Sequence, residues 1–264
     1  MKRLISLLCS LIFAGHLFSQ EVQYKVTYDC HTKVAKGSSH NGLNTLHFNS
    51  SSGLFIHNNW PKKDSLSSDG NLYQFTKGDL EGMPVYMNIK ERFIYYKSDY
   101  KATKTSFIFR EDLPKIAWQI QQDSSKKIEK FNCLKALGVF GGRTYEVWFT
   151  VDIPVSLGPY KLWGLPGLIL EAKSKDGAVT YQFRSYESSP ADAVKIEKPK
   201  NGQEITWAAF RTFVINQLLQ VEALSTDEYQ ITNYDPVADW EIEKNKFTII
   251  SDYRKQQQKT EKRE

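Results

Sequence analysis

Short segments in which apolar and polar residues alternate constrain the fold of this chain more than any other feature. The clearest one is EVQYKVTYDC, residues 21–30. A period of two is typical of a strand with one buried and one solvated face, so Tyr28 and Cys30 are expected to point to the buried side. Aromatic residues make up 13% of the chain, a composition that favours strands over helix bundles.

Further strand candidates follow this segment, separated by breaks rich in Gly, Asn, Asp and Ser such as NSSSG and SKDG. They are Leu43–Asn49, Gly53–Asn58, Asn71–Thr76, Val85–Ile89, Arg92–Lys97, Thr105–Arg110, Ala117–Gln121, Lys127–Leu134, Arg143–Thr150 and Ala178–Tyr186, with a weaker one at Phe247–Ile250. Such spacing is typical of an antiparallel meander. We therefore expect a mostly β fold, with a curved antiparallel sheet or half-barrel.

One segment, Ile205–Leu224, predicts an amphipathic helix instead. It contains no Gly or Pro and places Phe210, Phe213 and Val214 at helical spacing. We expect this C-terminal helix to pack on the sheet. In outline the predicted elements are similar to periplasmic lipoprotein carriers, in which a half-barrel leaves an apolar concavity.

The first twenty residues have the pattern of an export signal. Lys2 and Arg3 precede an apolar stretch that is too short to span a bilayer, and polar residues follow it. We expect cleavage near Ser19 or Gln20, which leaves a single β-rich domain over 21–252 and a charged, disordered tail over 253–264. No later segment is long and apolar enough to span a membrane, so the mature chain is expected to be periplasmic or secreted.

From the charge pattern we do not expect a nucleic-acid partner. The whole chain carries 35 basic and 30 acidic residues, and the excess of basic residues is concentrated in the last eleven residues, RKQQQKTEKRE. The body shows no basic stripe interleaved with aromatic residues, which is the usual footprint of a nucleic-acid surface.

Two cysteines remain after removal of the signal, Cys30 and Cys133. An exported protein meets conditions that permit disulfides, so a bridge between them is one alternative. The other is that each is a separately buried small apolar residue.

The motifs for catalysis and metal binding are sparse. The four histidines of the mature chain, His31, His40, His47 and His57, lie close together in sequence, and His47 and His57 fall on consecutive strand candidates. They are weak candidates for a copper or zinc site, because their spacing differs from that of structural zinc sites. No catalytic motif stands out, so we expect neither a cofactor nor catalytic residues, although a hydrolase with an unrecognised site stays an alternative.

A family resemblance comes from residues 152–169, DIPVSLGPYKLWGLPGLI. The stretch GLPGLI, residues 164–169, resembles the signature of the GLPGLI family of secreted envelope proteins of Gram-negative bacteria. The resemblance extends upstream to residues 131–150 and downstream through LEAKSKDG. It implies no established catalytic residues, and it implies an association with outer-membrane TonB-dependent transporters.

The same segment has a physical interpretation. Its prolines fix φ and its glycines permit close backbone approach, which predicts consecutive tight turns between two strands. The segment is either a structural plug, filled by Tyr160 and Trp163, or the lining of a binding groove or interface. In the second alternative the binding residues are Tyr160, Trp163, Gly164, Leu165, Pro166, Gly167 and Leu168.

These observations favour an exported, non-enzymatic binding or accessory protein. We expect it to receive an apolar or peptide ligand, or to dock on an outer-membrane transporter or another envelope protein. The sequence does not identify the ligand, the partner or the oligomeric state.

Overall fold

The computed structural model describes residues 22–33, 39–57, 65–66, 72–73, 83–100, 105–189, 194–223 and 259. The strands are β1 (Gln23–Lys33), β2 (Ser39–Phe48), β3 (Ser52–His57), β4 (Ser65–Leu66), β5 (Leu72–Tyr73), β6 (Met83–Asn88), β7 (Phe93–Tyr100), β8 (Thr105–Asp112), β9 (Gln119–Ile128), β10 (Phe131–Phe140), β11 (Arg143–Thr150), β12 (Leu168–Ser174), β13 (Val179–Ser189) and β14 (Gln203–Ile205). The helix is α1 (Trp207–Ala223). The predicted signal, most of the predicted tail and the strand candidate Phe247–Ile250 lie outside the described residues.

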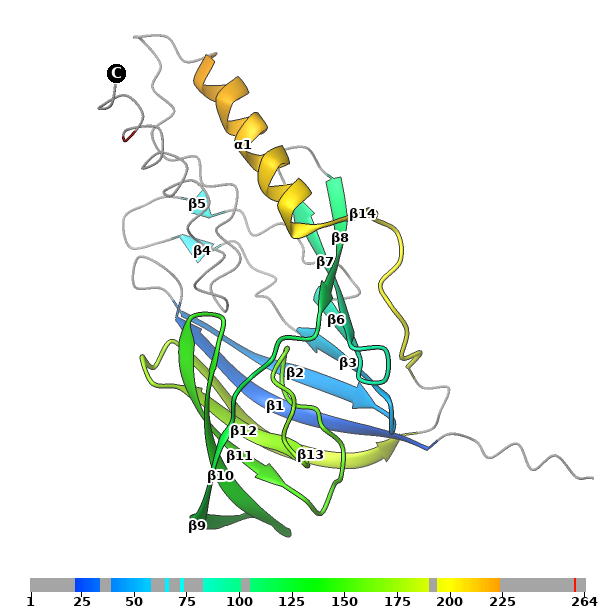
Figure 1. Ribbon diagram of the computed structural model, residues 1–264, viewed down its shortest axis with the longest axis vertical. Coiled ribbons are helices and arrows are strands. Elements are labelled where there is room, and N and C mark those ends of the chain that lie inside the picture. Colours follow the sequence, from blue (N-terminus) through cyan, green and yellow to red (C-terminus); the bar gives the residue numbers. More distant parts are fainter. Residues whose placement is uncertain are drawn as a thin grey trace, which may run out of the picture.

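Twelve strands form one open sheet, in the order β14-β8-β7-β6-β3-β2-β1-β13-β12-β11-β10-β9 (Figure 1). Neighbouring strands of this sheet are antiparallel, except that β14 runs parallel to β8. The central strand β1 pairs with β2 on one side and with β13, from the far end of the sheet-forming sequence, on the other. The prediction of a mostly β fold built on an antiparallel sheet is confirmed.

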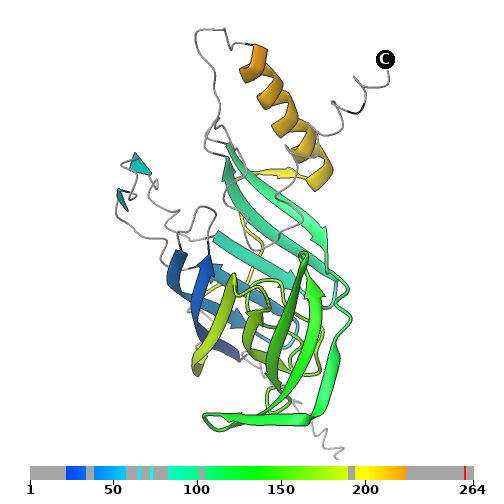
Figure 2. The ribbon, with the colours of Figure 1, turned by 90° about the vertical axis from the view of Figure 1, so that its left-hand side faces the viewer.

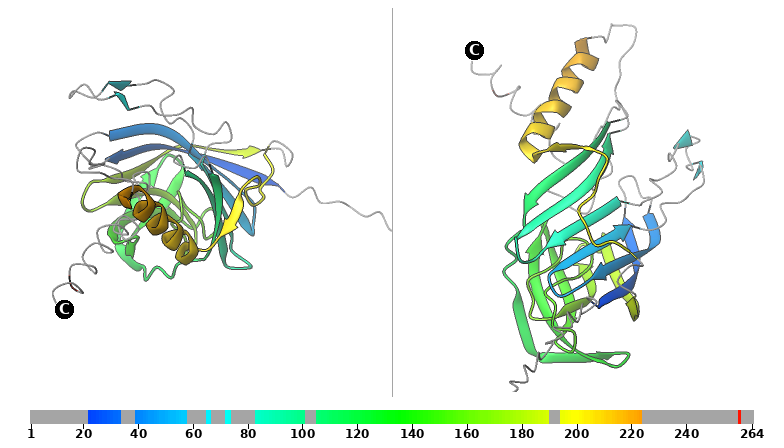
Figure 3. Two further views of the ribbon diagram at one scale, coloured as in Figure 1. Left: turned by 90° about the horizontal axis from the view of Figure 1, so that it is seen from above. Right: turned by 90° about the vertical axis from the view of Figure 1, so that its right-hand side faces the viewer.

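The sheet is strongly curved, and its concave face holds the hydrophobic core. The views in Figures 2 and 3 place β1 and β2 on one side of the bend and β10 and β11 on the other. Alternation in β1 buries Val26 and Tyr28 on the concave face, as the sequence predicts. The ring of Tyr28 packs edge-on against Tyr181 of β13, and Tyr181 in turn packs against Phe55 of β3. Aromatic contacts of this kind join the strands across the centre of the sheet.

Helix α1 packs on the β8 end of the sheet and not over its centre (Figure 1). Among the helix side chains that the structure describes, Phe210 and Val214 are buried. The Phe210 ring lies 5.3 Å from that of Phe107 and 5.0 Å from that of Phe109, both on β8. The prediction of a C-terminal helix packed on the sheet is confirmed, and its start is two residues later than expected.

One predicted strand, Lys127–Leu134, is wrong. The structure places a turn inside it, between β9 and β10, at Glu129 and Lys130. Glu129 has φ of 48°, a left-handed conformation usually taken by Gly or Asn, so the sequence carries no ordinary signal for this turn. The three-residue β14 was not predicted either, because it is short and mostly exposed.

Candidate functional site

The segment between β11 and β12, residues 151–167, lies against the concave face and is called the plug here. Its apolar side chains are buried in the core, and they are Ile153, Val155, Leu157, Leu162, Trp163 and Leu165. Leu157 reaches the middle of the sheet, where the absence of a side chain at Gly53 makes room for it. The structure therefore agrees with the plug alternative for the core-facing part of this segment.

Two glycines of the GLPGLI motif explain how the plug returns to the sheet. A Cβ atom at Gly167 would lie 2.0 Å from the carbonyl oxygen of Thr150, so only glycine permits this approach. Gly164 has φ of 98°, a conformation that side chains strongly disfavour. Tyr160 also has a positive φ, 57°, and because it is not a glycine its side chain makes this conformation strained. Strain of this kind persists only where the surroundings hold the backbone.

Tryptophan hydrogen bonds fix the plug to the connection between β8 and β9. The indole N–H of Trp163 donates to the carbonyl of Pro114 at 2.6 Å. The indole N–H of Trp118 donates to the carbonyl of Trp163 at 2.7 Å. Within the plug, the Ser156 hydroxyl donates to the Leu165 carbonyl at 2.8 Å and accepts from the Gly164 N–H at 3.1 Å. These four bonds fix the backbone of the GLPGLI turn to the β8–β9 connection and to the preceding part of the plug.

An ion pair between a buried lysine and a half-buried glutamate, which sequence reasoning missed, joins the plug to the other half of the sheet. Lys161 is 1% exposed, and its Nζ lies 3.1 Å from Oε2 of Glu111 on β8. The same Nζ lies 3.7 Å from the ring centroid of Tyr96 on β7, and the Tyr96 hydroxyl donates to Oε1 of Glu111 at 2.9 Å. A charge that is buried and paired in this way fixes the geometry of the elements that carry it. The one signal in the sequence is a lone lysine inside an apolar motif.

The predicted binding residues divide into a buried and an exposed set. Tyr160 is half-buried, and Trp163, Leu165, Gly167 and Leu168 are buried. Gly164 and Pro166 are exposed. The motif thus presents only the tip of one turn to solvent, and its large rings face inward.

Exposed apolar residues lie on both sides of this tip. On one side, Gly164 lies next to Trp118, and Ile120, two residues further along, is 42% exposed. On the other side, Gly167 packs against the backbone of Val151, and Val151 is 54% exposed. Gly164, Pro166, Ile120 and Val151 are called the apolar rim here; they are the exposed residues of the motif turn together with one exposed apolar residue close in sequence to each of its contacts, Trp118 and Thr150.

The predicted histidine site is not assembled. The β2–β3 hairpin exists, but Asn44 pairs with His57 and Leu54 pairs with His47. Alternation then places His57 on the concave face and His47 on the outer face, so they cannot share one ion. His31 is half-buried and its Nδ1 lies 2.6 Å from Oδ1 of Asn41. Side-chain placement of His40 lies outside the described residues.

Other metal ligands do not gather in the part of the chain that the structure describes, where no group of three His, Cys, Asp or Glu side chains could hold a metal ion. Burial lowers the pKa of His57 to about 4, and it lowers the pKa of His47 as well, with Lys25 contributing. Both imidazoles are therefore neutral near pH 7.

The disulfide alternative is wrong for this structure, in which Cys30 and Cys133 are free. Three strands, β13, β12 and β11, separate β1 from β10 in the sheet. At about 4.8 Å per strand this spacing exceeds the reach of a disulfide, which needs α-carbons within about 7 Å. Burial raises the pKa of the Cys30 thiol and raises that of Cys133 to about 11, so neither is an activated nucleophile.

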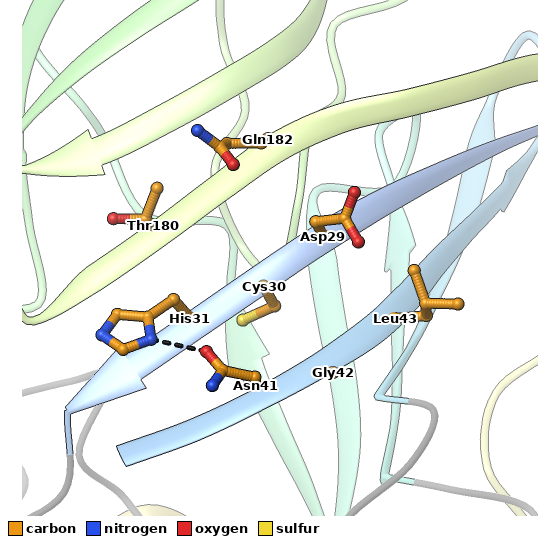
Figure 4. A pocket seen from close by; sticks show the side chains of 8 residues that line it. All are labelled: Asp29, Cys30, His31, Asn41, Gly42, Leu43, Thr180 and Gln182. Carbon is orange, nitrogen blue, oxygen red and sulfur yellow. Dashed lines mark hydrogen bonds between the residues drawn. The ribbon is translucent and has the colours of Figure 1, made fainter.

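A pocket of about 460 Å³ lies on the outer face of β13, β1 and β2 (Figure 4). Its lining is Asp29, Cys30, His31, Asn41, Gly42, Leu43, Thr180 and Gln182. Asp29 accepts from Arg184 at 2.8 Å, which occupies the carboxylate. The imidazole of His31 is bonded to the Asn41 amide, and the carboxylate of Asp29 is in an ion pair. The pocket lining therefore does not place a nucleophile in contact with a base. We interpret the pocket as part of the solvated polar face of the sheet.

Comparison with protein families gives a match to a part of the chain that contains the plug. Residues 89–171 match the model of a family described as a protein of unknown function (Porph_ging). The matched stretch begins after β6 and ends in β12, so it contains the whole plug and the GLPGLI motif. It covers about a third of the chain. No curated protein matches the sequence.

Two solved structures of PNGF-II, in space groups P21 and C2, are similar to this chain. Each has a TM-score of 0.51, with 17% and 18% identity, and each alignment covers 74% of this chain and 33% of the PNGF-II chain. This chain thus corresponds to about a third of PNGF-II, and at this identity the similarity shows the fold alone. A LolA superfamily protein, NE2245 from Nitrosomonas europaea, aligns over 64% of this chain and 87% of its own, with 9% identity and a TM-score of 0.28, too low to support an argument.

Within the described residues, no helix combines the length and the apolar character that a membrane crossing requires.

Proposed function

We propose that this chain is an exported, non-enzymatic binding or accessory protein that docks on an envelope partner through the apolar rim. The observation that carries the proposal is the contrast within one turn. Gly164 and Pro166 are exposed, while a hydrogen bond from the Trp118 indole to the Trp163 carbonyl, a hydrogen bond from the Gly164 N–H to the Ser156 hydroxyl and the ion pair of Lys161 hold the neighbouring backbone. A preorganised turn loses little conformational entropy on binding.

The filled concave face supports docking of a macromolecule or peptide over enclosure of a small ligand. Leu157, Leu162 and Trp163 occupy the space in which an open half-barrel would hold an apolar molecule. The partner we propose is an outer-membrane transporter or another envelope protein, in keeping with the resemblance to the GLPGLI family. Metal handling and hydrolysis stay alternatives that no contact among the described residues favours.

Site-specific photo-crosslinking in native cells tests the proposal. A photoreactive residue is introduced at Ile120 or at Val151, and in a matched control at Val139, which is 61% exposed on the face of β10 opposite Gly138. We expect one partner to be crosslinked from positions 120 and 151 and not from 139. Equal adducts from all three positions, or none, would contradict docking at the apolar rim.

Charge variants give an independent measurement of the same surface. Val151→Glu is expected to reduce recovery of the crosslinked partner from position 120 at least tenfold, because it places a charge in an apolar contact. Val139→Glu should leave recovery unchanged. Both residues are exposed, so the melting temperature of either variant should stay close to that of the wild type.

Fractionation and N-terminal sequencing check export and the cleavage near Ser19 or Gln20.

A further inference from the structure

A buried histidine of β3 contacts the turn of the plug at residues 159–161. His57 is 8% exposed and lies on the concave face at the end of β3. Its ring packs edge-on against Phe55 at 4.9 Å and against Tyr160 at 5.7 Å between ring centroids. The Nζ atom of Lys161 lies 5.2 Å from the centroid of the same Tyr160 ring. One tyrosine ring is therefore in contact with a neutral imidazole and with a buried ammonium group.

We propose that the contact between His57 and Tyr160 is an acid-sensitive latch, and that protonation of His57 releases the plug from β3 while the rest of the sheet stays folded. A protonated His57 would be a second buried cation beside the ring that already packs against Lys161. Burial of this additional charge destabilises the closed arrangement by desolvation.

Among the described residues, few groups near His57 could stabilise the positive charge of a protonated imidazole. Across β2 the partner is Asn44, which is uncharged, and across β6 it is Met83. Through Phe55, His57 is linked to the hydroxyl-bearing rings of Tyr28 on β1 and Tyr181 on β13. Through Tyr160 it is linked to Lys161 on the plug, which contacts Tyr96 on β7 and pairs with Glu111 on β8. The two oxygens of the Glu111 carboxylate already accept from Tyr96 and from Lys161.

The direction of the pH effect follows from linkage. Burial depresses the pKa of His57 to about 4, whereas the released side chain has an ordinary pKa near 6.5. Above pH 6.5 both forms are neutral, and the closed plug keeps its full stability. As the pH falls from about 6.5 toward 4, the released form binds the proton more readily than the closed form, so the ratio of released to closed plug rises by about fivefold to eightfold per pH unit.

Hydrogen exchange measured from pH 7 to pH 5, corrected for the chemical exchange rate, tests the latch. This range lies above the ordinary titration of carboxyl groups. Peptides from the plug, residues 153–163, are expected to open about fivefold more often at pH 5.5 than at pH 6.5, while peptides from β11 stay protected. His57→Gln should abolish the rise. His47→Gln, which alters a histidine on the outer face, should preserve it.

A second measurement applies to the wild type alone, in case His57→Gln does not fold. The NMR signals of the Tyr160 ring should change with the same midpoint as those of the His57 ring. A plug that shows no rise, a rise that survives in a folded His57→Gln, an equal rise in β11, or unrelated midpoints would overturn the proposal.

Discussion

The α-carbon of Gly167 approaches the carbonyl of Thr150 so closely that a Cβ atom would lie 2.0 Å from the oxygen. Thr150 ends β11 and Leu168 begins β12, and these two residues pair across the strands. The plug thus leaves and re-enters the sheet at one point, where its two ends are in backbone contact. This contact closes the plug as a loop on the sheet.

Gly167→Ala should therefore destabilise the protein strongly. The methyl group meets backbone, which cannot rotate away, so we expect a loss of about 3 kcal/mol in the free energy of unfolding, measured with urea. Gly164→Ala is the matched control, because its Cβ would meet only the Trp118 indole at 3.6 Å and its cost of about 1 kcal/mol comes from positive φ. Equal losses would contradict the role of the Thr150 contact.

Trp163→Phe tests the hydrogen bond to Pro114. Removal of the indole N–H leaves a carbonyl without its donor at 2.6 Å, and we expect a loss of about 2 kcal/mol. Trp163→Ala adds a cavity in the core and should cost about 4 kcal/mol. Trp148, half-buried beside Lys126 and Lys135, provides the control, because Trp148→Phe is expected to cost less than 1 kcal/mol.

A double-mutant cycle measures the ion pair of Lys161 and Glu111. Lys161→Met alone leaves the carboxylate without its cation, and we expect a loss of about 3 kcal/mol. Adding Glu111→Gln should recover at least half of this loss, because the unpaired charge disappears with it. The surface pair Lys25 and Glu187, at 2.8 Å, gives the reference cycle, with an expected coupling below 1 kcal/mol. Similar coupling energies in the two cycles would contradict a special role for Lys161.

Both cysteines of the mature chain are expected to be reduced. Thiol titration of the denatured protein without reductant should find two thiols, Cys30 and Cys133. In the native protein at pH 8 the reaction should be slow, because burial raises the pKa of both thiols. A denatured protein without titratable thiols would show that a disulfide forms after all.

The strands could be predicted because their signal is local. Alternation in residues 21–30 predicted strand β1 and its buried Val26 and Tyr28, although β1 extends from Gln23 to Lys33, and the run of apolar residues after Thr206 predicted α1. The turn at Glu129 was missed because the conformation is imposed by the hairpin and not by a turn residue. The sequence also predicted that the plug makes tight turns, because prolines and glycines act locally.

The partners of the plug could not be predicted in the same way. Lys161 and Glu111 are fifty residues apart in sequence, and Trp118 and Trp163 are forty-five apart, so only the curvature of the sheet brings them together. Likewise, consecutive strands suggested a shared site for His47 and His57. Their separation on two faces depends on the register of the hairpin, which sequence spacing alone does not fix.

The pairing of β1 with β13 has a consequence for the order of folding. Gln23 lies opposite Ser189, so the centre of the sheet joins residues that are more than 150 positions apart. Contacts of such separation form late and slowly, because a long loop must close before they contribute. The first strand to leave the ribosome can pair with β2 soon afterwards, but its other edge must wait for β13. For a polypeptide that we propose to be threaded through a translocon, this delay would keep the chain unfolded until it has crossed.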